Sequence, residues 1–83
     1  MSVAGAVARV HREEWARVVA ALARRFGDLD VAEDAAAEAF VTAVERWPAD
    51  GVPPNPGAWL TTTAHRKAID RIRRESRRDE KHR

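Results

Sequence analysis

The chain has 83 residues, a net charge of +2 and no cysteine, so it is at most one small domain without disulfides or thiolate metal sites. Hydrophobic residues make up 45% and charged residues 34%, a balance typical of a folded protein rather than a disordered one. Apolar runs are shorter than the roughly 18 residues of a membrane span, and a signal peptide is not recognisable. We therefore expect a cytoplasmic protein.

Three segments have helical periodicity, and the first extends from about residue 3 to residue 26. Its expected core side carries Ala8, Trp15, Val19, Leu22 and Phe26. Gly27 follows as a residue that can take the left-handed conformation that ends helices. His11 falls on the core side, and we expect a packed, hydrogen-bonded histidine there rather than a metal ligand.

The second helix is expected over residues 30–47. Asp30 is the predicted N-cap, Glu33 completes a capping box, and Pro48 ends the helix. One side of this helix is apolar and small, which permits close approach of a neighbouring helix. Its residues are Ala32, Ala36, Ala39, Phe40, Ala43 and Trp47.

The opposite side of the second helix is acidic. Its residues are Asp30, Asp34, Glu38, Val41 and Glu45. It is either a solvated surface or a docking stripe for a basic partner, with Val41 as an apolar contact in its middle. Carboxylates four residues apart repel one another, which favours the docking interpretation slightly.

A proline-rich loop over residues 48–55 precedes the third helix, expected over residues 56–77. Asn55 and Pro56 read as N-cap and first helical residue, and this positively polarised helix start favours anions. The apolar arc comprises Leu60, Ala64, Ala68 and Ile72. The fold class is therefore an all-α, compact bundle of three main helices.

The outer arc of the third helix is basic. It carries Trp59, Thr62, Arg66, Lys67, Arg73, Arg74 and Arg77. Arginines that neutralise successive phosphates, next to an aromatic ring that stacks a base, are typical of single-stranded nucleic-acid binding. Alternatively, Trp59 folds over Pro54 and closes the helix start. We expect the carboxylates and the arginines to occupy separate outward surfaces.

The sequence contains no nucleophile–base constellation and no glycine loop that cradles phosphates, so we expect no enzyme, no cofactor and no metal. Two functions fit these residues besides strand binding: a general basic module that binds duplex DNA or RNA, and a protein–protein adaptor.

The segments "GDLDVAEDAAAEAF" and "AWLTTTAHRKAIDRIRR" resemble region 2 of the extracytoplasmic-function (ECF) sigma factors of bacterial RNA polymerase, from about Trp15 to Arg78. The resemblance implies a transcription initiation module that binds the polymerase core and melts the promoter minus-ten element through its non-template strand. Two positions depart from the family pattern, Ala37 in place of glutamine and Arg66 in place of asparagine.

By matching position, the resemblance assigns contact with the β′ clamp helices to Asp34 and Glu38, flanked by Asp30, Val41 and Glu45. Asn55, in the loop, would help to form a pocket for a flipped base, with Arg66, Lys67, Arg73 and Arg74 on the strand's backbone. An anti-sigma factor is a further implied partner. We expect residues 1–78 to form the region 2 domain and residues 79–83 to begin a linker toward a second DNA-binding domain.

Overall fold

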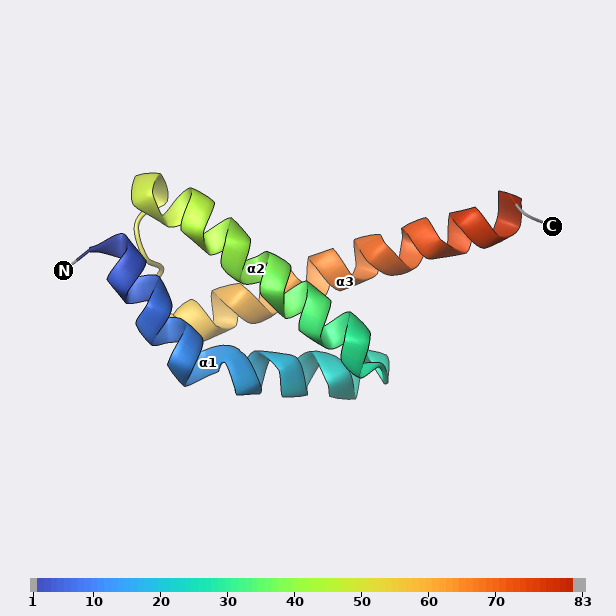
Figure 1. Ribbon diagram of the computed structural model, residues 1–83, viewed down its shortest axis with the longest axis horizontal. Coiled ribbons are helices and arrows are strands. Elements are labelled where there is room, and N and C mark those ends of the chain that lie inside the picture. The colour runs from blue at the N-terminus through green and yellow to red at the C-terminus, as the bar shows by residue number, and fades with distance from the viewer. Residues whose placement is uncertain (1, 82–83) are drawn as a thin grey trace.

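The computed structural model describes the backbone of residues 2–81 and the side chains of residues 2–78. It contains three helices, α1 (Val3–Phe26), α2 (Leu29–Asp50) and α3 (Pro56–Lys81), and the described residues form no strand. The predicted all-α class with three main helices is confirmed (Figure 1).

The three helices cross one another rather than lying parallel. Figure 1 shows α3 passing across α2, with its C-terminal part projecting beyond the other two helices. This projection accounts for the elongated shape, which measures 53 Å by 25 Å by 16 Å. The N-terminal half of α1 starts beside the C-terminal end of α2 and runs away from it, and α1 changes direction near its middle.

The core is built around the small side chains of α2. All six residues of the predicted apolar side are buried, and Ala35 is buried with them. They pack in one cluster with Val18 and Leu22 of α1 and with Leu60 of α3. Because most of these α2 residues are alanines, the neighbouring helices can approach the α2 backbone closely.

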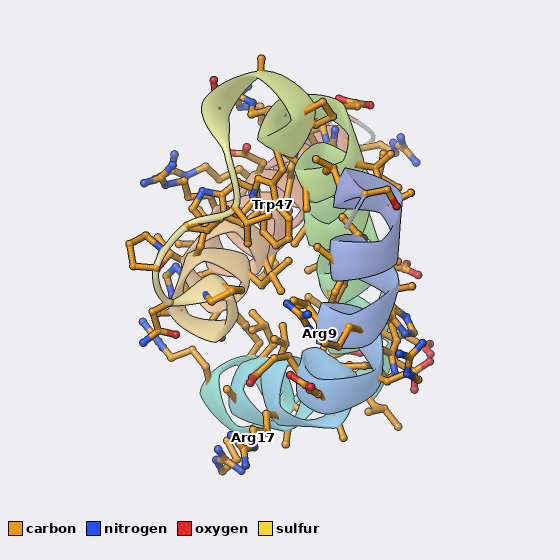
Figure 2. The ribbon with its side chains drawn as sticks, turned by 90° about the vertical axis from the view of Figure 1, so that its left-hand side faces the viewer. Arg9, Arg17 and Trp47 are labelled. Atoms are coloured by element: carbon orange, nitrogen blue, oxygen red, sulfur yellow. The ribbon has the colours of Figure 1, made fainter. Side chains whose placement is uncertain are left out.

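Trp47 is the largest fully buried side chain, and Figure 2 shows it directed into the bundle. Its ring meets the ring of Trp59 edge to face, with 5.3 Å between the centroids. The indole nitrogen of Trp47 has no hydrogen-bond partner among the described residues. Arg17, in contrast, points away from the bundle (Figure 2), and its side chain is 81% exposed.

The first helix has the predicted length, but its buried side was predicted only in part. Ser2 caps it by accepting a hydrogen bond from the Gly5 N–H, and Gly27 ends it with φ 68°, as expected. Ala8, however, is exposed, whereas Ala6, Val7 and Val10 are buried. The change of direction in α1 displaces the buried side of its first half from the line that the second half defines (Figure 1).

His11 is also exposed rather than buried, which corrects the expectation of a core histidine. Its ring lies against Trp15 and Phe40, with centroids 5.1 Å and 4.8 Å apart. The histidine therefore covers the edge of the core.

Both predicted ends of α2 were wrong. Asp28, not Asp30, is the N-cap, because its carboxylate accepts the Val31 N–H at 3.1 Å, so Asp30 and Glu33 form no capping box. At the other end, α2 continues past Pro48 to Asp50. A proline in the last turn forfeits only one helical hydrogen bond, and the Gly51 N–H closes the helix on the Trp47 carbonyl at 2.8 Å.

The third helix begins as predicted and ends later. Asn55 Oδ1 accepts the Ala58 N–H at 3.1 Å, which confirms Asn55 as the cap. The helix continues to Lys81 rather than ending near residue 77, and the last two residues lie outside the described part. Leu60, Ala64 and Ala68 are fully buried, whereas Ile72 is 40% exposed because α3 leaves the bundle there.

Candidate functional site

The acidic face of α2, which comprises Asp30, Asp34, Glu38, Val41 and Glu45, is entirely exposed. It lies opposite the buried alanines because the two sets alternate at helical spacing. Val41 is 56% exposed, and two other large apolar residues of α2, Leu29 and Val44, are exposed to a similar extent. The face thus combines carboxylates with an accessible apolar surface.

One residue of this face is already engaged. Asp34 Oδ2 lies 2.6 Å from Arg71 Nη1, and Arg71 Nε lies 3.0 Å from Glu75 Oε1. The expectation of two separate charged surfaces is therefore wrong at Asp34, because an arginine of α3 reaches across to α2. The pair is a surface contact, since the Asp34 side chain is 69% exposed.

Arg71 was not predicted as a site residue, although its position in the sequence of α3 is unusual for a charged residue. On a helical wheel it falls within the apolar arc of α3, between the directions of Leu60 and Ala64. A charge in such an arc needs a partner or marks the place where the helix leaves its neighbours. The hydrogen bond to Glu75, aided by the charges of Glu75, Asp34 and Asp28, raises the pKa of Arg71 above its ordinary value.

An apolar groove of about 500 Å³ borders the acidic face on the side of α1. Val41, Val44 and Pro48 line it from α2, and Val7 and His11 line it from α1. Val44 is 55% exposed. Sequence reasoning missed this groove because it forms between two helices, and only Val41 was assigned to an interaction surface.

The basic face of α3, which comprises Trp59, Thr62, Arg66, Lys67, Arg73, Arg74 and Arg77, is also open to solvent. Trp59 and Lys67 are half-buried, and the other five residues are exposed. Trp59 packs against the ring of Trp47, which gives it a structural role in the bundle. One side of Trp59 still lines a groove between α2 and α3.

That groove has a volume of about 240 Å³. Thr42 and Arg46 of α2 form one wall. Trp59, Thr63, Arg66, Lys67 and Asp70 of α3 form the other. It brings together three residues predicted from the sequence, Trp59, Arg66 and Lys67, and adds Arg46, which was not predicted.

The connecting loop follows α2 at Gly51, whose φ of 87° favours glycine. Val52, Pro54 and Asn55 are exposed, and Pro53 is half-buried. The side-chain oxygen of Asn55 caps α3, so only the remainder of its amide is left for other contacts. The loop therefore exposes both apolar side chains and the polar Asn55 next to the start of α3.

The start of α3 is not an open anion site, contrary to the sequence-based expectation. A Cβ placed on Gly57 would lie 2.6 Å from Glu14 Oε2, so this carboxylate of α1 sits directly against the first turn of α3. A negative side chain at a helix N-terminus is favourable, and here the chain supplies its own. A phosphate would have to displace Glu14.

Among the residues whose placement is described, no group of three or more metal-ligating side chains comes together. Within the same residues, no helix has the length and apolar character to cross a membrane.

Comparison with known proteins places these features in a family. The model of the family described as "Sigma-70 region 2" matches residues 11–78 of this chain. An uncharacterized protein of Rhizobium meliloti (strain 1021) is 43% identical over 61 residues, which cover 74% of this chain but 14% of that protein. No solved structure gives a significant match to the chain. Because the family match spans far more than half of the sequence, the chain belongs to the sigma-70 region 2 family.

Proposed function

We propose that this chain is the region 2 module of a sigma factor of the ECF subfamily, and that it acts in transcription initiation. The observation that carries the proposal is the presence of two exposed faces of opposite charge, on two helices of a chain that belongs to this family. The acidic face would bind the polymerase, and the basic face would bind promoter DNA.

The proposed polymerase contact is the acidic face of α2 against the β′ clamp helices. Glu38 and Glu45 offer carboxylates that a basic partner can reach, and Val41 leads into the apolar groove beside α1. Charge complementarity of this kind accelerates association and orients the partner. A basic residue of the clamp would have to share Asp34 with Arg71 or displace Arg71.

The proposed DNA contact is the non-template strand of the minus-ten element. The arginines of the basic face would neutralise its phosphates, and the proline-rich loop with Asn55 would contribute to a pocket for an unstacked base. Prolines restrict the unbound loop, so less ordering entropy opposes capture of the base. Extruding a base costs a few kcal/mol, which loop contacts and polymerase binding together would offset.

In this role the chain performs no chemistry of its own, and it is not an enzyme. An anti-sigma factor would act by covering one of the two faces.

The proposal is tested by titrating the full chain with single-stranded oligonucleotides that carry systematic changes in a minus-ten sequence. Each titration is run with and without a fragment containing the β′ clamp helices. We expect weak, salt-sensitive binding alone, and tighter, sequence-dependent binding with the fragment. Equal affinity for every oligonucleotide under both conditions would show that the chain is not a promoter-reading module. Duplex of the same sequence serves as the control for a general basic module.

A further inference from the structure

One wall of the groove between α2 and α3 is formed by residues of α2, which lie outside the basic face of α3. Arg46 is the one lysine or arginine in α2, whose other charged residues are acidic. It nevertheless lines the groove on the side of α3, together with Arg66 and Lys67. Two helices therefore direct cations toward one small space.

The charge in this groove is not balanced by its own lining. Arg46, Arg66 and Lys67 supply three positive charges, and Asp70 supplies the one carboxylate. Like charges gathered in this way repel one another unless an anion lies between them. At about 240 Å³ the groove is smaller than the roughly 300–1,000 Å³ of clefts for drug-sized ligands, so it suits a small group.

The remaining lining residues indicate which kind of anion fits. Trp59 gives the groove an apolar, half-buried ring surface, and Thr63 adds a hydroxyl. Thr42 donates its hydroxyl hydrogen to the Glu38 carbonyl at 3.0 Å, so this hydrogen is not available to an anion in the groove. Cations beside an aromatic ring match a phosphodiester with its neighbouring sugar or base better than they match an isolated inorganic ion.

We propose that this groove binds one backbone phosphate of single-stranded nucleic acid, with Arg46 on one side and Arg66 and Lys67 on the other. That the strand is promoter DNA rests on the proposed function, whereas the binding of a phosphate is inferred from the residues that line the groove. Because Arg46 belongs to α2, the strand would be held by the helix that carries the acidic face as well as by α3. Guanidinium groups suit this role because they can contact two phosphate oxygens at once.

The test is fluorescence anisotropy of a labelled oligodeoxythymidylate with the full chain, between about 50 and 200 mM salt. Arg46→Ala is compared with Arg46→Lys and with Arg12→Ala, which removes the same charge from an exposed site on α1 outside the groove. Losing one phosphate contact on a single strand should reduce the salt slope by about 0.7, or affinity about fivefold at 0.1 M salt.

We expect this loss for Arg46→Ala, retention of the slope for Arg46→Lys, and a smaller change for Arg12→Ala. Asp70→Asn should tighten binding, because it removes the carboxylate that repels the phosphate. Circular dichroism checks that each exposed substitution leaves the helices intact. Inorganic phosphate at equal phosphate concentration should compete poorly.

An Arg46→Ala variant that behaves like Arg12→Ala would overturn the groove proposal. If Arg66→Ala still weakens strand binding in that case, the proposed function survives and the groove alone is wrong. If the wild-type chain binds no single strand, alone or with the clamp fragment, both proposals are wrong. Complete competition by inorganic phosphate would show that the groove takes a free anion rather than a strand.

Discussion

Replacement of Trp47 tests how the junction between α2 and α3 is held together. The side chain is 1% exposed, and its ring supports Trp59 at the head of the basic face. Truncating such a residue to alanine typically costs about 3–5 kcal/mol. At about 0.05–0.15 kcal/mol per residue, a chain of 83 residues has a total stability of about 4–12 kcal/mol, so Trp47→Ala should remove a large part of it.

Trp47→Phe should behave very differently, because the indole N–H has no partner among the described residues. Leaving such a donor buried costs about 1–3 kcal/mol, and phenylalanine removes it. The smaller ring leaves a void and buries less apolar surface, so the packing that is lost offsets part of this gain. Trp47→Phe should therefore cost clearly less than the roughly 3–5 kcal/mol expected for Trp47→Ala.

Urea unfolding followed by far-ultraviolet circular dichroism measures both variants without relying on tryptophan fluorescence. Trp59→Phe is the matched control, since Trp59 is partly exposed and its substitution relieves no buried donor. A Trp47→Phe variant that loses as much stability as Trp47→Ala would refute the reasoning, because the N–H would then be satisfied in solution.

Three further substitutions test individual contacts. Asp34→Asn breaks the surface ion pair with Arg71 and should leave the thermal unfolding temperature nearly unchanged. The same substitution should weaken binding of a clamp-helix fragment. Unaltered affinity in a binding titration would show that Asp34 is not part of the interface. Asn55→Ala should cost about 1 kcal/mol in urea unfolding, whereas Asn55→Asp keeps the cap; equal losses would contradict the capping role. Gly57→Ala gains up to about 1 kcal/mol of helix propensity but forces Glu14 aside, so it should stabilise the chain more in a Glu14→Ala background than alone.

The sequence was most informative where one pattern had one physical explanation. The alanine side of α2 and the arc of Leu60, Ala64 and Ala68 are buried, as the helical spacing of their small and apolar residues predicts. Asn55 before Pro56 defined the start of α3 because both residues favour the same position there. The exposure of the acidic and basic faces followed from the same helical spacing.

Sequence reasoning failed where two residues could serve equally or where a contact crosses helices. Asp28 and Asp30 are equally good caps, and only the backbone conformation selects Asp28. Pro48 is tolerated inside α2 because it lies in the last turn, where it forfeits only one helical hydrogen bond. The Asp34–Arg71 pair joins residues 37 positions apart, and no periodicity within one helix predicts such a contact. The grooves on either side of α2 depend on crossing geometry in the same way.

The central claim is that the acidic face of α2 and the basic face of α3 bind two different macromolecules. The most direct measurement compares Glu38→Lys with the double variant Arg73→Ala and Arg77→Ala, recording affinity for the clamp fragment and for a minus-ten single strand. We predict that Glu38→Lys loses the clamp and keeps the strand, and that the arginine variant loses the strand and keeps the clamp. Loss of both affinities in both variants, or of neither, would contradict the division into two faces.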